Sequence, residues 1–180
     1  MQHAHTDQPT VLVLASGRGE RFLASGGQSH KLKALLSGKP VLQHTLDAVR
    51  ASGLPWHVED AGHPGMGDSI AAAVRATVDS DGWLILPGDL PLIQPATIAL
   101  LAGALAQHDV VVPVVNGQRG HPVGFSSACR DALLHLAGEQ GAAPVMRSHQ
   151  AVQFAVDDIG CITDIDTLAD LARAESLLQR

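Results

Sequence analysis

The segment SGRGER, residues 16–21, combines residue types that bind phosphate. Its two glycines allow a tight turn in which backbone N–H groups approach an anion, and its two arginines add positive charge. Lys31 and Lys33 follow shortly after. Such a loop suits a triphosphate better than a neutral nucleoside. The segment lacks the GxxxxGK[ST] pattern and the complete GxGxxG pattern, so a glycine turn without a ligand is the alternative.

Asp89 is the second residue that points to chemistry. It stands between Gly88 and Leu90, directly after the apolar run GWLILP at residues 82–87. A carboxylate at that point suits Mg²⁺, which binds through carboxylate oxygen and keeps its waters for phosphates. The alternative is a structural one, in which Asp89 caps the next helix or closes an Asx turn.

The elements that must position these residues are two buried strands. The apolar runs at residues 10–15 and 82–87 each end at one of the two segments. In an open α/β sheet, ligands bind outside the carboxyl ends of the strands. The glycine-rich loop and Asp89 are therefore expected to converge on one ligand.

The rest of the chain alternates short apolar runs with helical patterns, which is typical of a mostly parallel α/β sheet. Predicted strands cover residues 10–15, 56–59, 82–87, 109–115, 121–126 and 152–156. Predicted helices cover residues 40–52, 66–78, 94–108, 127–137 and 166–178. Pro113 lies inside a predicted strand, which indicates an edge strand or a bulge.

The composition restricts the class of protein. A chain of 180 residues with 46% hydrophobic residues is the size of one domain with a single core. A net charge of −6 disfavours nucleic-acid and membrane-surface binding, and no apolar run is long enough to span a bilayer. Cys129 and Cys161 form no CxxC pair, so reduced thiols are expected. We expect a cytoplasmic protein with a disordered leader, residues 1–9, and one domain, residues 10–180.

Seven segments together resemble the MobA-like nucleotidyltransferases, and their molybdenum cofactor cytidylyltransferase branch in particular. In chain order they are LASGRGERF, Lys31, LLSGKPVLQHTLDAV, GMGDSIAAAV, LILPGDLPLI, RGHPVGF and DIDTLADL. The resemblance covers nearly all residues from 10 to 178. It implies a single-domain, Rossmann-like, three-layer α/β/α fold with a mostly parallel sheet. It also implies a Mg²⁺-dependent enzyme that joins an NTP to a phosphorylated acceptor and releases pyrophosphate.

The resemblance assigns roles to individual residues. The implied catalytic residues are Arg21, Lys31 and Asp89. The implied nucleotide-binding residues are Ala15, Ser16, Gly17, Arg18, Gly19, Gly67 and Ser69. The implied acceptor-binding residues are Arg119, Gly120, His121 and Pro122. Asp89 would bind Mg²⁺, with Asp164 or Asp166 as a second carboxylate. The acceptor phosphate would attack the α-phosphorus directly, without a covalent enzyme intermediate.

Several of these residues have structural alternatives. His121 could be a neutral core histidine, and Ser69 could help to start its helix. Asp166 is a natural N-cap for the last helix. A lengthened loop before Lys31 leaves open whether Lys31 or Lys33 contacts phosphate, although Lys33 is expected to be solvated.

The resemblance also leaves the substrates open. Between GKPVL and GMGDS the family has an additional strand and helix, so one edge βα unit is expected to be missing here. The RGHPV segment favours CTP over GTP as donor, with molybdopterin as acceptor. Delivery of the product to a molybdoenzyme is left open. The alternatives are an enzyme acting on another small phosphate, such as a sugar phosphate or an isoprenoid precursor, and a non-catalytic nucleotide-binding module.

Overall fold

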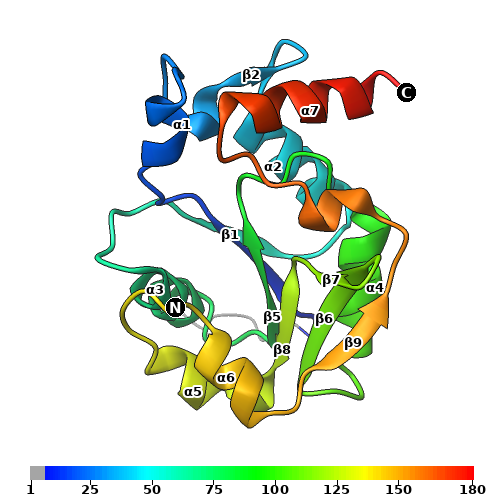
Figure 1. Ribbon diagram of the computed structural model, residues 1–180. Coiled ribbons are helices and arrows are strands. Elements are labelled where there is room, and N and C mark those ends of the chain that lie inside the picture. Colours follow the sequence, from blue (N-terminus) through cyan, green and yellow to red (C-terminus); the bar gives the residue numbers. More distant parts are fainter. Residues whose placement is uncertain (1–6) are drawn as a thin grey trace.

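The computed structural model describes residues 7–180, so residues 1–6 of the expected leader lie outside the described residues. A seven-stranded sheet forms its centre, in the order β4-β1-β5-β8-β6-β7 with β9 paired to β6 (Figure 1). The strands are β1 (Thr10–Leu14), β4 (Trp56–Glu59), β5 (Gly82–Pro87), β6 (Val110–Val115), β7 (Gln118–Arg119), β8 (Val123–Ser126) and β9 (Val152–Ala155). All but β7 and β8 run parallel to one another. The predicted mostly parallel α/β fold is confirmed.

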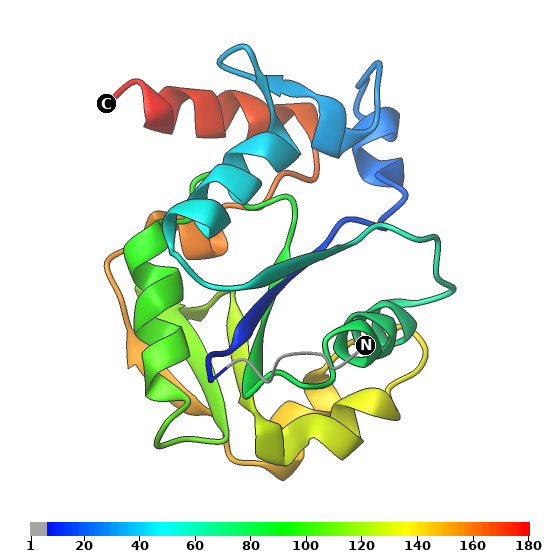
Figure 2. The ribbon, with the colours of Figure 1, turned by 180° about the vertical axis from the view of Figure 1, so that it is seen from behind.

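Helices cover both faces of this sheet (Figures 1 and 2). One face packs against α2 (Val41–Ala51) and α4 (Pro95–Ala104), and the other against α3 (Met66–Ala76), α5 (Arg130–Leu134) and α6 (Ala143–Ser148). In β1, Val11 and Val13 face the first layer and Leu12 faces the second. Because successive strand residues point to opposite faces, a strand covered on both sides needs an unbroken apolar run.

A cap lies above the carboxyl ends of β1 and β5, at the top of Figure 1. It consists of α1 (Glu20–Ala24), the 3₁₀ turn η1 (Lys31–Lys33), the hairpin of β2 (Leu35–Leu36) and β3 (Lys39–Pro40), and α7 (Leu168–Leu178). Phe22, Leu36 and Ala174 are buried together in its own apolar cluster. Thr167 caps α7 in a capping box with Asp170, which fixes where that helix begins.

Some boundaries differ from the predicted ones. The helix predicted for residues 94–108 ends at Ala104, and the one predicted for residues 127–137 divides into the 3₁₀ turn η2 (Ser127–Cys129) and α5. A third 3₁₀ turn, η3 (Ile159–Ile162), follows β9. Of the two alternatives predicted from Pro113, the edge strand is wrong, because β6 lies inside the sheet. Pro113 falls between the residues that pair with β8 and those that pair with β7, so its missing N–H breaks no ladder there.

The segment between the cap and α3 holds one helix, α2, and one strand, β4, which ends the strand order. This agrees with the expected absence of one edge βα unit. Trp56 on β4 is 41% exposed, and the Arg50 guanidinium lies 5.2 Å from its ring centroid. Within residues 7–180, no helix has both the length and the apolar character needed to cross a membrane.

Candidate active site

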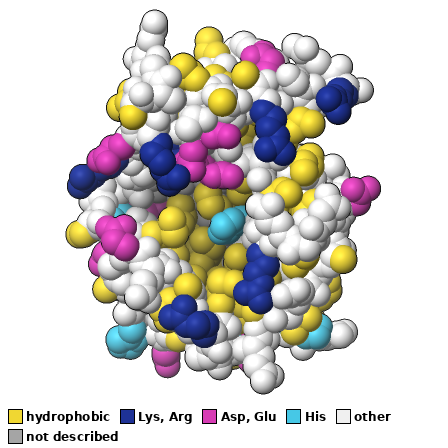
Figure 3. All heavy atoms as spheres, in the orientation of Figure 1, with side chains coloured by type: hydrophobic (Ala, Val, Ile, Leu, Met, Phe, Trp, Pro, Cys, Tyr) yellow, Lys and Arg dark blue, Asp and Glu magenta, His cyan; other side chains and the backbone are white. Residues whose placement is uncertain are grey.

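A cavity of about 620 Å³ opens at the carboxyl ends of β1, β4 and β5. Its walls are the loop after β1, η1, the loop that leads into α3, and the residues that follow β5. Figure 3 shows a hollowed face with acidic and basic side chains gathered along the upper side of the hollow. The two segments singled out from the sequence, residues 16–21 and Asp89, therefore line one cavity.

The glycine-rich loop lines this cavity and contains backbone amides without a hydrogen bond. Gly19 has φ +67°, a left-handed conformation, and is the N-cap of α1. Among residues 7–180, the N–H groups of Gly17, Arg18 and Gly19 find no hydrogen-bond acceptor. Since backbone donors are normally paired, three unpaired N–H groups in one turn suit an anion.

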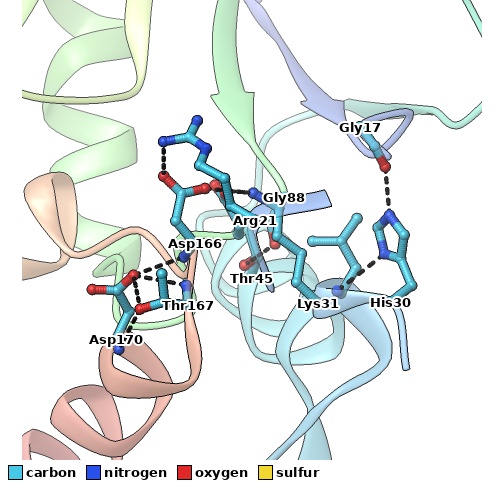
Figure 4. A network of polar contacts seen from close by, with 11 residues as sticks. Gly17, Arg21, His30, Lys31, Thr45, Gly88, Asp166, Thr167 and Asp170 are labelled. Carbon is cyan, nitrogen blue, oxygen red and sulfur yellow. Dashed lines mark hydrogen bonds and ion pairs between the residues drawn. The ribbon is translucent and has the colours of Figure 1, made fainter. Parts of the chain in front are cut away.

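His30 supports this loop from the η1 side (Figure 4). Its Nδ1 accepts a hydrogen bond of 3.2 Å from the Leu32 N–H, so in the neutral ring the proton is on Nε2. Nε2 contacts the carbonyl oxygen of Gly17 and donates to it. His30 therefore ties the glycine-rich loop to the segment that carries Lys31.

The backbone around Asp89 is fixed by three elements. The Gly88 N–H donates to the Leu14 carbonyl at 2.9 Å, and the Thr45 hydroxyl of α2 donates to the Gly88 carbonyl at 2.9 Å. The Ile165 N–H donates to the Asp89 carbonyl at 3.0 Å. Asp89 is only 9% exposed, and the N-cap of α4 is Gln94, so Asp89 does not cap that helix.

Lys31 and Arg21 form an ion network with two aspartates. Lys31 Nζ lies 2.7 Å from Asp89 Oδ2 and 3.0 Å from Asp166 Oδ1, and Arg21 Nη1 lies 3.1 Å from Asp166 Oδ2. Figure 4 shows Arg21 and Lys31 both directed toward Asp166. Lys33 is exposed, so Lys31 is the lysine that reaches the cluster.

The network shifts the pKa values of Lys31 and Asp166. Burial alone would lower the pKa of Lys31, but the charges and hydrogen bonds of Asp89 and Asp166 raise it. Burial alone would raise the pKa of Asp166, but the Lys31 hydrogen bond and the charges of Lys31 and Arg21 lower it. Each of these two shifts favours the charged form, of Lys31 and of Asp166.

Asp164 completes an acidic cluster with Asp89 and Asp166. Each of the three offers one carboxylate oxygen, and these oxygens lie within 4.8 Å of one another. Partial desolvation and the nearby charges of Asp89 and Asp166 raise the pKa of Asp164. Asp89 Oδ1 is buried and has no hydrogen-bond partner among the described residues. Three carboxylates facing two cations, with one buried oxygen unpaired, fit a hard divalent cation.

The residues implied to bind the nucleotide divide into two groups. Ser16 lines the cavity, and its hydroxyl lies 2.9 Å from that of Ser69, which joins the glycine-rich loop to α3. Ser69 does not cap α3, because the N-cap of that helix is Gly65. Ala15 and Gly67 do not line the cavity. Gly67 instead packs against the backbone of Ala137, with no room for a side chain.

The segment implied to bind the acceptor, residues 119–122, does not line this cavity. It packs against η3, where the His121 N–H donates to the Cys161 carbonyl at 3.0 Å. Burial lowers the pKa of His121, and the charge of Asp89 opposes that shift, so the ring lies within the electrostatic reach of Asp89. Asp166, by contrast, is not the N-cap of α7, because Thr167 has that position.

Sequence reasoning assigned Gly67 and Ser69 of the GMGDS segment to the nucleotide, but it did not name the residues before Gly67 that form one wall of the cavity. His63, Pro64 and Gly65 line the cavity just before α3, and Met66 lines it as the first residue of that helix. Behind them, the buried Glu59 carboxylate accepts from His63 Nε2 at 3.0 Å, from His57 Nε2 at 3.4 Å and from the Ala61 N–H at 3.3 Å. The available signal was a glutamate at the end of a short strand with histidines two residues before and four after it.

A family comparison decides the affiliation of the chain. The MobA-like NTP transferase domain matches residues 48–152, which is more than half of the chain. The chain belongs to this family. The match begins in α2, so it includes β5 and Asp89 but not the glycine-rich loop.

Known proteins support the affiliation at different levels. The bifunctional protein GlmU of Desulfitobacterium hafniense is 26% identical over 165 residues, covering 79% of this chain and 36% of that protein. The chain thus spans little more than a third of the length of such curated relatives. The crystal structure of Rv0371c from Mycobacterium tuberculosis superimposes with TM-score 0.79 at 24% identity over 94% of this chain and 98% of that one. The same protein has been solved with manganese.

A third comparison involves the molybdopterin-guanine dinucleotide biosynthesis protein A from Archaeoglobus fulgidus. It superimposes with TM-score 0.68 at 19% identity over 94% of this chain and 98% of that one. At these identities the solved structures establish the Rossmann-like nucleotidyltransferase fold. They do not carry substrates over to this chain.

Proposed function

We propose that this protein is a divalent-metal-dependent nucleotidyltransferase that joins an NTP to a phosphorylated acceptor and releases pyrophosphate. The observation that carries the proposal is the acidic cluster with the buried, unpaired Asp89 Oδ1, at one end of a cavity that also holds unbonded loop amides. Metal ligands and an anion cradle in one cavity suit a metal–triphosphate complex better than either feature alone would.

The phosphate-binding part is assigned as follows. Gly17, Arg18 and Gly19 donate backbone N–H groups to the triphosphate, and Arg21 and Lys31 neutralise its charge. Mg²⁺ or a similar hard ion would be held by Asp89, with Asp164 and Asp166 as further carboxylates. When bound, such an ion adds positive charge beside the transferring nucleotidyl group. Lys31 reaches both Asp89 and Asp166, so it orients the carboxylates as well as carrying charge toward the phosphates.

The acceptor approaches from the side of residues 119–122. His121 has a lowered pKa because of burial, so it stays neutral near Asp89 and does not compete with a metal for that carboxylate. An acceptor phosphate already carries its negative charge, so it attacks the α-phosphorus without a general base. The chain then acts by positioning the two phosphates and stabilising their charge.

For the substrates themselves we propose CTP as donor and molybdopterin as acceptor, with GTP as the alternative donor. The RGHPV segment supports the first choice. A fold neighbour named for molybdopterin-guanine dinucleotide biosynthesis is in keeping with a molybdopterin acceptor and with the alternative donor. A sugar phosphate remains the alternative acceptor, and a molybdoenzyme is the partner that would receive the finished cofactor.

The test measures pyrophosphate release by wild type and Asp89→Ala with each of CTP, GTP, ATP and UTP, with Mg²⁺ or with EDTA. Each mixture receives molybdopterin, a sugar 1-phosphate or no acceptor. We expect release that needs metal, one acceptor and Asp89. Mg²⁺-dependent NTP binding followed by no release with any acceptor would contradict this acceptor class. Absence of NTP binding by wild type would contradict the proposal as a whole.

A further inference from the structure

Glu59 is a buried carboxylate whose oxygens are both occupied. It ends β4, is 8% exposed, and accepts hydrogen bonds from His57, His63 and the Ala61 N–H. Its backbone carbonyl accepts from the Ala15 N–H at 2.9 Å, at the start of the glycine-rich loop. One residue therefore connects two walls of the cavity, the loop after β1 and the loop that leads into α3.

The contact with Glu59 defines how His63 is presented. A carboxylate can only accept, so the proton of a neutral His63 ring lies on Nε2, 3.0 Å from Glu59 Oε1. Nδ1 is then an acceptor, and it has no hydrogen bond among the residues that the structure describes. His63 lines the cavity, and its side chain is 21% exposed. When its ring is neutral, His63 thus gives the cavity wall a hydrogen-bond acceptor that has no partner among residues 7–180.

The location of His63 indicates what it meets. The groups proposed to bind phosphate and metal, Arg21, Lys31 and Asp166, belong to α1, η1 and the segment before α7, whereas His63 precedes α3. It lies beside Pro64, Gly65 and Met66, a stretch without charge. A flat, weakly polar group with one or two hydrogen-bonding edges suits such a wall, and in a nucleotide that group is the base.

We infer that His63, held by Glu59, selects nucleobases that carry an exocyclic amino group. The inference rests on the proposed function and specifies the donor further. An amino group of cytosine, guanine or adenine donates to Nδ1, whereas an oxo group in the same position would oppose one acceptor with another. Leaving an acceptor unpaired in a closed site is what discriminates between such bases. His63 contacts the base, and Glu59 is a positioning residue that acts through it.

The experiment compares dissociation constants within matched nucleotide pairs, by calorimetric titration with Mg²⁺. CTP and UTP differ at position 4, and GTP and ITP differ by the 2-amino group. Wild type is compared with His63→Phe, which keeps a planar ring without a nitrogen, and with His63→Leu as a second variant. Glu59→Gln tests the positioning, because an amide can donate to Nε2 and reverse the hydrogen bond. His57→Gln is the matched control, since His57 also contacts Glu59 but does not line the cavity.

We expect wild type to bind the amino member of one pair on the order of tenfold more tightly than its partner. The ratio should fall to about one in both His63 variants, decrease in Glu59→Gln, and change less than about twofold in His57→Gln. A purely structural role would weaken both members of a pair equally and leave the ratio intact. Two outcomes would overturn this inference while leaving the proposed function in place, provided that nucleotide binding still depends on Asp89. One is a wild type with no preference within either pair, and the other is a preference that survives in both His63→Phe and His63→Leu. If no nucleotide binds to wild type, the proposed function fails first.

Discussion

Asp89 and Glu59 are two buried carboxylates on either side of β1, and they differ in how many hydrogen-bond partners their oxygens have. Asp89 lies two residues after β5 and Glu59 is the last residue of β4, and both strands pair with β1 in parallel. The exposed fractions of Asp89 and Glu59 are 9% and 8%. The Glu59 carboxylate accepts from three donors, and both donating side chains are histidines. Asp89 has one cation on Oδ2, no partner on Oδ1 among residues 7–180, and two further carboxylates nearby.

The difference shows that burial alone does not reveal the role of a carboxylate. A satisfied buried carboxylate stabilises the loop around it, as Glu59 does for residues 60–65. An unsatisfied one among like charges is unfavourable in the protein by itself and becomes favourable only with a ligand. Replacing Glu59 should therefore affect folding, whereas replacing Asp89 should affect ligand binding and turnover.

The largest effect is expected for Asp89→Asn. Asparagine keeps the size of the side chain and removes the charge, so we expect pyrophosphate release to fall by about 10²–10³-fold. The free energy of unfolding should change by less than about 1 kcal/mol, because lost pairing with Lys31 is offset by relieved repulsion. Pyrophosphate release and thermal melting measure the two quantities.

Asp47→Asn is the matched control for this variant. Asp47 pairs with Lys39 at 2.7 Å, the same distance as the pair of Lys31 and Asp89, but its side chain is 44% exposed. The control should leave turnover unchanged. Equal losses in both variants would show that the pairing, and not the location in the cavity, is what matters.

The next largest effect is on stability, in Glu59→Ala. Two histidines and the Ala61 N–H lose their acceptor inside the protein, which should lower the free energy of unfolding by about 1–3 kcal/mol. For a chain of 180 residues this is a decrease in Tm of several degrees. If Asp89→Asn destabilises the protein more than Glu59→Ala in chemical denaturation, the contrast between the two carboxylates is wrong.

Of the two carboxylates, the sequence predicted the role of Asp89, because that residue stands out from the residues around it. An apolar run followed by Gly-Asp reveals a strand end with an unexplained charge, so Asp89 was apparent, as was Lys31 after the glycine-rich loop. The parallel strands β1, β5 and β6 were apparent for the same reason, since strands buried on both faces read as continuous apolar runs. The positions of Arg21, Lys31 and Asp89 along the chain were therefore enough to predict the charged end of the cavity.

The role of Glu59 could not be predicted, because it depends on contacts between residues that form no recognisable sequence pattern. Glu59, His63 and His30 act through hydrogen bonds to loop residues, and the spacing of histidines around Glu59 does not by itself reveal such a contact. The helices α1 and α6 have 5 and 6 residues and are too short to show the helical spacing of apolar residues from which a helix is predicted. Tertiary packing, rather than propensity, decides that Gly67 contacts Ala137 instead of a ligand.

A third prediction concerns the pH dependence of the Glu59 contribution. Burial would raise the pKa of Glu59, but hydrogen bonds from His63 and His57 hold it below the ordinary value of 4.5. Between the pKa of Glu59 in the folded protein and its ordinary value of 4.5, the unfolded chain binds more protons than the folded one. The stability contributed by the carboxylate is therefore present above about pH 4.5 and is lost as the pH falls through the folded-state pKa.

Melting of wild type and Glu59→Gln from pH 7 to pH 3.5 tests this sign. The excess stability of wild type should be constant in the upper part of the range and decline below about pH 4.5. An excess that grows on acidification would mean that the carboxylate is not the group whose charge is stabilised.

The smallest effect is expected for Asp164→Asn and has the opposite sign to that of Glu59→Ala. In EDTA, removing one of three adjacent carboxylates relieves repulsion with Asp89 and Asp166, so the free energy of unfolding should rise by under about 1 kcal/mol. With Mg²⁺ or Mn²⁺ the order should reverse, because wild type offers one more ligand oxygen and gains more from the ion. Melting temperatures of both proteins across a metal titration measure the crossing point. Parallel curves would place Asp164 outside the metal-binding group and leave the acidic cluster with Asp89 and Asp166 alone.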